Sequence, residues 1–259
     1  MEKRGSRLKN KRQNSNHLVI GYHPVLEYIL ANKPIGKILI QKNIKSEHVS
    51  IIQKCKEVGI PYQLVPIEKL NKISSKNHQG IIAFISPIEF SNVYNLLPQL
   101  YEEGKIPFFL MLDRITDVRN FGAICRTAEC AGVHAILIPE KGSARINEDA
   151  IKASAGALAH LHICREHNLK KTIQFLKESG LLILACTEKS ENTIYQENLD
   201  IPLCIILGSE DDGISPEYLK LSDKKAKIPM YGNIRSLNVS VSAAIIIYEI
   251  LRQRKKLSI

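Results

Sequence analysis

Polar residues and glycines gather in three segments of the chain, each of which follows a predicted strand. The first runs from Asp113 to Thr127 and contains Asn120, Gly122 and Arg126. Backbone N–H groups at the start of a helix bind anions, and an arginine one helical turn beyond Gly122 can reach the same anion. The segment therefore predicts a phosphate site; by itself it also fits a helix cap with a surface arginine.

The second segment, residues 207–215, is an acidic loop bounded by Gly208 and Gly213. Acidic loops are common as solvated turns, so this segment alone predicts little. The third begins at Ile228 and continues over residues 236–244, where hydroxyl and amide side chains enter an apolar helix. It also fits a capped core helix that packs closely on a neighbour.

Several common catalytic motifs do not occur in the sequence. No glycine-rich dinucleotide motif or P-loop follows a predicted strand, and a GxSxG hydrolase motif is missing as well. There is no HExxH motif and no pair of closely spaced cysteines. His160, His162 and His167 alternate as in a strand and have no fourth ligand nearby, so no metal site is predicted.

The elements that must position the three segments form two α/β halves. Residues 17–88 alternate strand and helix. Pro87, Pro98 and Gly104 surround a polar, partly helical stretch and predict a linker at residues 89–105, and residues 106–259 alternate again. Continuous apolar strands with intervening helices predict a parallel sheet covered on both faces, whose ligands bind beyond the carboxyl ends of the strands. We expect strands at 37–40, 61–65, 79–85, 107–112, 134–138, 181–186, 203–207 and 227–229, and helices at 46–58, 122–131, 169–178, 216–221 and 239–252.

Charge indicates a polyanionic partner. The chain of 259 residues carries 36 basic and 26 acidic side chains, a net charge of +10. Residues 1–16 hold six basic residues and one acidic residue and are expected to be disordered. A second basic cluster, Arg252, Arg254, Lys255 and Lys256, closes the chain. Such tails fit a polyanion, because neutralised phosphates release counterions, and they fit a solubilising role equally well.

Composition excludes some classes of protein. Apolar residues make up 44% and charged residues 24%, which is typical of a globular protein rather than a disordered or fibrous one. No apolar run approaches the ~20 residues that span a bilayer, so we expect no membrane association. The charged N-terminus does not resemble a secretory signal, and six cysteines without a CxxC pair indicate reduced thiols and a cytoplasmic protein.

In order and spacing, the three segments resemble the three motifs of SpoU-type (TrmH-family) RNA ribose 2′-O-methyltransferases of the SPOUT class. The front half, with Gly21–Glu27 and His78–Ala83, resembles the L30e-like substrate-binding domain of this family. Together with residues 131–135, it is most similar to the RlmB-type enzymes, which methylate a guanosine of 23S ribosomal RNA. The matching residues are Asn120-x-Gly-Ala-Ile-x-Arg126-Thr, Leu207-Gly-Ser-Glu210-x-x-Gly and Ile228-Pro-Met-x(5)-Ser236-Leu-Asn238-Val-Ser-Val.

This resemblance implies a fold and a cofactor. The second half is expected to be a parallel-sheet domain with a deep trefoil knot, which binds S-adenosylmethionine in a bent form. The family forms homodimers, in which the arginine of the first motif faces the partner's cofactor. Carried over by position, the cofactor contacts are Gly208, Ile228 and Leu237, with Leu207, Thr187 and Met230 as neighbours.

The resemblance also implies catalytic residues. The family assigns activation of the ribose 2′-hydroxyl to the first-motif arginine, here Arg126. Because an arginine side chain is a poor base, we expect Arg126 to hold the adjacent phosphate and to stabilise the forming alkoxide. It could serve as the base only if it were strongly desolvated beside the positive charge of the cofactor. We expect Asn120 and Glu210 to position Arg126 and the knot loop, and Ser236 and Asn238 to order the loop that reaches cofactor and ribose.

Three alternatives stay open from the sequence. The substrate could be a tRNA ribose instead of ribosomal RNA. The chain could also be a non-catalytic RNA-binding assembly factor, or an enzyme acting on a small molecule. In addition, Asp211 and Asp212 stand where relatives often have smaller residues. Near an RNA phosphate, these two carboxylates should weaken binding unless they point to solvent or to a basic neighbour, so they bear on the substrate more than on the reaction.

Overall fold

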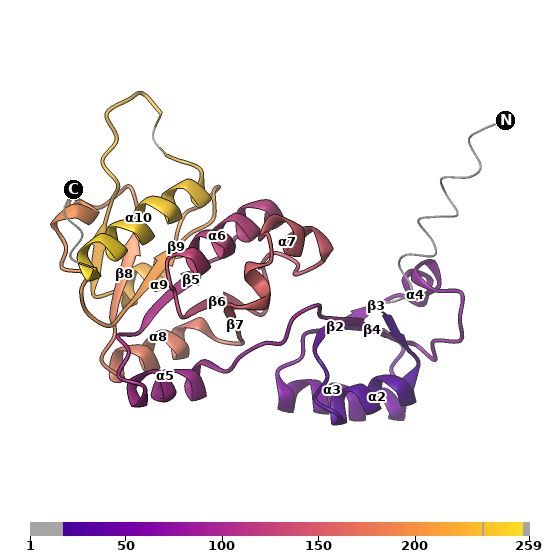
Figure 1. The fold of residues 1–259 in the computed structure, drawn as a ribbon. Helices are drawn as coiled ribbons and strands as arrows, with labels where there is room; N and C mark the ends of the chain where they lie inside the picture. The colour runs from indigo at the N-terminus through magenta and orange to yellow at the C-terminus, as the bar shows by residue number, and fades with distance from the viewer. Residues whose placement is uncertain (1–17, 235, 256–259) are drawn as a thin grey trace. The chain divides into compact units, whose positions relative to one another are not determined.

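The computed structural model describes residues 18–234 and 236–255, which fold as two compact units divided after Glu89. The predictions for the basic tail at residues 1–16 and for Lys256 fall outside these described residues. Each unit is an α/β structure with its own sheet and its own core (Figure 1).

The first unit has a four-stranded sheet in the order β1-β4-β2-β3. Strands β2 and β3 run parallel, whereas β4 pairs antiparallel with β1 and β2. Alternate side chains of β2 point to opposite faces: Ile38 and Ile40 join a core with α2 and α3, and Leu39 packs with α4. The elements are β1 (Leu18–Ile20), α2 (Tyr22–Leu30), β2 (Ile35–Gln41), α3 (Ser46–Val58), β3 (Tyr62–Val65), α4 (Ile67–Ile73) and β4 (Ile81–Ile85).

The second unit has a six-stranded parallel sheet in the order β10-β8-β9-β5-β6-β7. Two short 3₁₀ turns, η1 (Ala157–Ala159) and η2 (Ile194–Gln196), interrupt its loops. The other elements are α5 (Val93–Glu102), β5 (Phe108–Leu112), α6 (Val118–Cys130), β6 (Ala135–Pro139), α7 (Glu148–Ala153), β7 (His162–Glu166), α8 (Leu169–Glu178), β8 (Leu182–Cys186), β9 (Leu203–Leu207), α9 (Pro216–Leu221), β10 (Lys224–Ala226) and α10 (Val239–Arg254).

Helices cover both faces of this sheet. Phe109 and Met111 of β5 belong to a core shared with α5, α8 and α9, while α6 and α10 pack against each other on the opposite face (Figure 1). Every residue of β5 and β9 is buried. The prediction of an α/β protein with a covered parallel sheet and a separate front unit is therefore confirmed. The deep trefoil knot stays a prediction.

The segment at residues 89–105 differs from the linker that was predicted there. It contains α5, which includes Pro98 in its second half. Val93, Leu97 and Leu100 of this helix are buried in the core of the second unit. A linker was expected because Pro87, Pro98 and Gly104 surround a polar, partly helical stretch; in the structure the apolar residues of that stretch lie on one face of α5, which is buried.

Two further element predictions were wrong in position. The short strand expected at residues 227–229 lies three residues earlier, at β10, where Ala226 pairs with Cys186 of β8. Helix α6 begins at Val118 instead of Gly122, because Asp117 accepts a hydrogen bond from the Asn120 N–H and caps the helix there. The predicted helices at 46–58, 169–178 and 216–221 and the strand at 203–207 are confirmed.

None of the helices between residues 18 and 255, apart from the undescribed position 235, is long and apolar enough to cross a membrane. All six cysteines are free thiols, and Cys130 alone among them is exposed.

Candidate functional site

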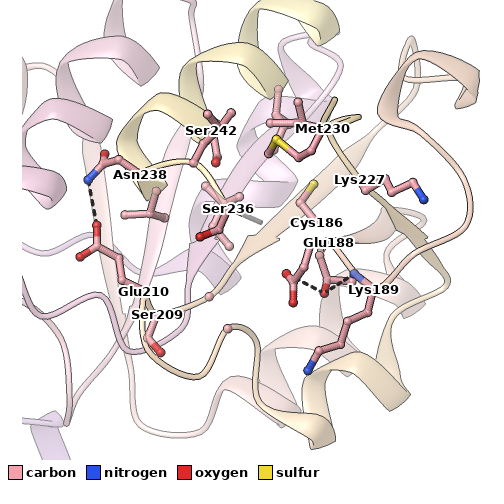
Figure 2. Close-up of a pocket in the computed structure, with 18 of the residues that line it drawn as sticks. Cys186, Glu188, Lys189, Ser209, Glu210, Lys227, Met230, Ser236, Asn238 and Ser242 are labelled. Carbon is pink, nitrogen blue, oxygen red and sulfur yellow. Dashed lines mark hydrogen bonds between the residues drawn. The ribbon is translucent and has the colours of Figure 1, made fainter. Parts of the chain in front are cut away.

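A cavity of about 760 Å³ opens at the carboxyl ends of β8, β9 and β10. The loops that follow these strands form its walls, and the start of α10 closes it (Figure 2). This is the edge at which parallel α/β sheets bind their ligands, because there the loops diverge and leave a crevice. Figure 2 shows Asn238 and Glu210 on one side of the cavity, and Glu188 and Lys189 on the other.

Most of the predicted site residues line this cavity. Six were expected to contact a cofactor, and all six lie in its wall: Thr187, Leu207, Gly208, Ile228, Met230 and Leu237. Three of the five predicted catalytic residues, Glu210, Ser236 and Asn238, line it too. The structure thus brings together residues that are separated by as many as 51 positions, and the roles assigned to them stay predictions.

The wall of the cavity offers main-chain groups rather than charged side chains. Gly208, Ile228 and Leu237 make no main-chain hydrogen bond to any other residue that the structure describes. Their N–H and C=O groups therefore have capacity for a ligand. Gly208 is also sterically required, since a Cβ atom there would overlap the backbone of Gly213 and Ile214.

Beside the cavity, three side chains from distant segments meet at Glu210. Its Oε1 atom accepts hydrogen bonds from Asn120 Nδ2 at 2.6 Å and from Asn238 Nδ2 at 2.8 Å. Asn238 Nδ2 also lies 3.1 Å from Asn120 Oδ1. This junction of Asn120, Glu210 and Asn238 joins all three motif segments, and because Glu210 receives two amide donors its carboxylate is fixed in position.

Local sequence explains how each amide reaches the junction. Asn238 is the N-cap of α10: its Oδ1 accepts from the backbone N–H and the hydroxyl of Ser240, which leaves Nδ2 to donate. Asn120 lies in the first turn of α6, which Asp117 caps. Since α6 and α10 pack side by side, their N-terminal turns present both amides to Glu210.

The phosphate site predicted at the start of α6 is not supported. The N–H of Asn120 already donates to Asp117 at 2.8 Å. Gly122 is buried within the helix, and a Cβ atom there would overlap Ala153 of α7. Gly122 thus serves the close packing of α6 on α7 rather than the approach of an anion.

Arg126 lies apart from the junction. It is exposed, does not line the cavity and makes no hydrogen bond or ion pair with the described residues. Asn120 and Arg126 are six residues apart, which places them about 120° apart around the helix axis. Arg126 therefore faces away from the cavity-side junction of its own chain.

The acidic loop after β9 is tied to the end of β5 by Arg114. Its guanidinium donates to Asp212 at 2.8 Å, to the Gly213 carbonyl at 3.1 Å and to Asp113 at 3.2 Å. Asp113, only 2% exposed, also accepts from the N–H and hydroxyl of Ser215. Burial acts to lower the pKa of Arg114, but its hydrogen bonds and ion pairs with Asp113 and Asp212 raise it overall. Asp212 thus has a basic neighbour in Arg114.

Sequence reasoning missed several residues of the cavity wall, among them Cys186, Glu188, Lys189 and Ser242. The first three lie at or just beyond the end of β8, and no recognised sequence motif covers that segment. Only their position at the carboxyl end of a predicted strand could have identified them. Burial raises the pKa of the Cys186 thiol to about 12, so this thiol stays neutral and is no nucleophile at ordinary pH.

No group of three or more His, Cys, Asp or Glu side chains in the described part of the chain is arranged to hold a metal ion.

The fold and the site define a class of protein. The chain has a covered parallel sheet with a ligand-sized cavity at the carboxyl ends of its strands, next to a polar junction and after a separate α/β unit. The SpoU rRNA Methylase family matches residues 107–248, more than half of the chain, and the family "RNA 2'-O ribose methyltransferase substrate binding" matches residues 18–91. The chain belongs to the SpoU rRNA methylase family and is an RNA methyltransferase, which confirms the resemblance of the three motifs.

Individual relatives agree with this assignment. A protein of Staphylococcus aureus assigned to the TrmH family of tRNA/rRNA methyltransferases is 38% identical over 239 residues, which cover 92% of this chain and 96% of the relative. The TrmH/SpoU tRNA modifying enzyme of A. aeolicus is 30% identical with a TM-score of 0.55, over 62% of this chain and 85% of that one. The SpoU methyltransferase AviRb from Streptomyces viridochromogenes, solved with AdoMet, has the same fold, with a TM-score of 0.61 at 18% identity over 97% and 99% of the two chains.

Proposed function

We propose that this protein transfers a methyl group from S-adenosylmethionine to a ribose 2′-hydroxyl of RNA, with a guanosine of 23S ribosomal RNA as the target. The observation that carries the proposal is the junction of Asn120, Glu210 and Asn238 beside the cavity. It fixes a carboxylate next to a cofactor-sized space in a chain of the SpoU family. The protein would act in the cytoplasm, where its six free thiols persist.

The cavity fits S-adenosylmethionine in its chemistry. Gly208, Ile228 and Leu237 offer unused main-chain N–H and C=O groups, which suit the edges of an adenine base. Leu207, Met230 and Ile246 supply apolar surface for the ring. Around this wall, Glu188 and Lys189 provide charged groups for the hydroxyl and amino-acid parts of the molecule. A cavity of about 760 Å³ lies within the usual range for such ligands.

When bound, S-adenosylmethionine supplies an activated methyl group on its sulfonium. The residues of the chain then have to align the ribose oxygen with that methyl group and help to remove the hydroxyl proton. We assign the alignment of the loop to Asn120, Glu210 and Asn238, which hold one another in place. Ser236 orders the segment between the cavity and α10, and Arg126 binds the neighbouring phosphate and stabilises the alkoxide.

The place of Arg126 supports a homodimer as part of the proposal. Within one chain, Arg126 is exposed and outside the cavity wall. A second copy whose α6 lies near the first copy's cavity would bring its Arg126 to the ribose. The half-exposed side chains of Val241 and Tyr248 on α10 offer apolar surface for such a contact.

A tRNA substrate is the second candidate. One curated relative is assigned to tRNA/rRNA methyltransferases, and one solved relative is named a tRNA modifying enzyme. Ribosomal RNA is favoured because the family that matches the second unit is named for rRNA. A non-catalytic assembly factor is disfavoured, since a binding module has no need of a cofactor-sized cavity beside a fixed carboxylate.

The test is a transfer assay with methyl-labelled S-adenosylmethionine and total RNA from cells that lack this protein. We expect label in the large-subunit RNA, absent with Arg126→Ala, which keeps cofactor binding within a few fold. Mapping the product nucleotide then decides the base. Label in tRNA would overturn the ribosomal substrate and keep the reaction, whereas cofactor binding without transfer to any RNA, free or in precursor particles, would overturn the reaction.

A further inference from the structure

The loop after β9 carries more of the cavity wall than any other segment, and it has little packing of its own. Six consecutive residues, 208–213, line the cavity, including Glu210 of the junction. Three of them, Glu210, Asp211 and Asp212, are exposed acidic residues. A single narrow pair of backbone hydrogen bonds between Ser209 and Gly213 closes the loop on itself. Contacts from outside the loop hold it against the cavity: Asn120 and Asn238 donate to Glu210, and a second contact reaches the other end of the loop.

Arg114 provides that second contact. From the end of β5 it reaches Asp212 with Nη1 and the Gly213 carbonyl with Nη2, at 2.8 and 3.1 Å, while Nε donates to Asp113. These contacts bridge 98 and 99 positions of sequence. The buried carboxylate of Asp113 holds Ser215, just beyond the loop, so the loop is fixed at its far end as well.

The backbone of Arg114 indicates that this contact is specifically built. Its φ angle is +58°, a left-handed conformation that arginine rarely adopts. Such conformations persist only where the surrounding contacts hold them, and they gather at functional sites. Here the side chain reaches the loop after β9 from the end of β5.

We propose that Arg114 is a positioning residue for the cofactor: its planar fork holds the acidic loop in the shape that binds S-adenosylmethionine. This inference rests on the proposed function. The shape and the charge of the Arg114 side chain predict different effects of a lysine at this position. A lysine keeps the charge at position 114 but cannot reach two acceptors in one plane, so it does not replace the fork. Arg114 also cancels the charge of Asp212, which explains how this chain tolerates an extra carboxylate at the cavity rim.

The experiment measures binding of S-adenosylmethionine and S-adenosylhomocysteine by calorimetry to the full chain and to Arg114→Lys and Arg114→Gln. Both substitutions leave the left-handed backbone with an ordinary side chain, so backbone strain is the same in all three. We expect each to bind both ligands about tenfold more weakly, the loss that one charge-assisted hydrogen bond corresponds to. In the transfer assay, KM for S-adenosylmethionine rises by a similar factor and kcat falls less, since bound cofactor itself orders the loop.

The two ligands separate geometry from charge. S-adenosylmethionine carries one more positive charge than S-adenosylhomocysteine. If Arg114 acted through its charge alone, Arg114→Gln would raise the affinity for S-adenosylmethionine relative to that for S-adenosylhomocysteine. A changed ratio of the two affinities, or full recovery with Arg114→Lys, would overturn the fork as the cause. Asp212 is exposed, so Asp212→Asn does not disturb the core. This variant should lose less cofactor affinity than Arg114→Gln, and the two losses should not add in the double variant.

A matched control is Arg145→Gln, because Arg145 is an exposed arginine without a hydrogen bond to the described residues and is outside the cavity wall. It should bind both ligands as the unaltered chain does. If the unaltered chain binds neither ligand, the proposed function fails. If it binds them and the Arg114 variants bind equally well, the function stands and the positioning role of Arg114 is wrong.

Discussion

The turn at His78–Gly80 in the first unit and the junction of Asn120, Glu210 and Asn238 in the second both use polar side chains at strand ends. In the turn, the partners are close in sequence: His78 accepts from the Gly80 N–H and bonds Asn71. In the junction, the partners are 28 to 118 positions apart and every one is a side chain. The turn holds a backbone, whereas the junction holds a functional group.

The same contrast appears in burial. His78 of the first unit is buried and uses its ring nitrogens on Asn71 and on the Gly80 N–H, which lie seven and two positions away. Glu210 and Asn238 are exposed at the cavity, where a ligand can reach them. Short-range polar networks should therefore affect stability, and long-range networks at the cavity should affect activity. Four substitutions test this difference, beginning with the largest effect.

Asn238→Asp should reduce transfer by about 100-fold, the scale of a misplaced catalytic group. The aspartate still accepts from Ser240 and caps α10, but its second oxygen meets the Glu210 carboxylate instead of donating to it. Stability should change little. Asn168→Asp, which also keeps an N-cap but has no junction, is the control in transfer assays and thermal unfolding. Equal activity of both variants would contradict a role for the junction.

Gly208→Ala should weaken binding of S-adenosylmethionine by about tenfold or more. The added methyl group overlaps the backbone of Gly213 and Ile214, and such overpacking typically costs about 1–3 kcal/mol. In Gly232→Ala the methyl group meets nothing within 4 Å. Calorimetric titration of both variants checks the effect, and comparable affinities would show that the loop can shift without loss of the cavity.

His78→Ala should lower the free energy of unfolding of the first unit by about 1–3 kcal/mol, since it leaves the buried Gly80 N–H without its acceptor. Cofactor affinity should not change, because the cavity is lined only by residues of the second unit among those described. Urea unfolding and cofactor titration measure the two quantities. If His78→Ala lowered cofactor affinity and left the free energy of unfolding unchanged, the turn in the first unit would not differ from the junction in its effect.

The smallest effect is expected at Glu166, a local pair within the second unit that bonds Thr172. Burial raises the pKa of Glu166, so its charged form destabilises the fold and stability is lost as pH rises through the folded-state pKa. Glu166→Gln keeps the acceptor without the charge. Its advantage in unfolding free energy, of about 1 kcal/mol, should appear at pH 7 and disappear near pH 4. A pH-independent difference would exclude the carboxylate as its cause.

Much of the second unit could be predicted from its sequence. Every residue of β9 is apolar and buried, so composition alone marks a central strand, and α8 begins at Asn168, a good N-cap, with apolar residues on one face. Helix α5 was missed as part of the core because Pro98 and polar neighbours are equally typical of a linker. The first turn of α6 was missed since its cap, Asp117, stands in a run of polar residues.

The sequence by itself determined the family, most of the strands and about half of the cavity wall, because those depend on local apolar pattern and on motif spacing. Tertiary structure alone decided the partners. Nothing near Glu210 in sequence shows that its carboxylate meets Asn120 and Asn238, or that Arg114 holds Asp212. Hydrogen bonds act over about 3 Å of space whatever the separation along the chain, so only the folded sheet, which brings distant strand ends to one edge, could show which polar groups act together.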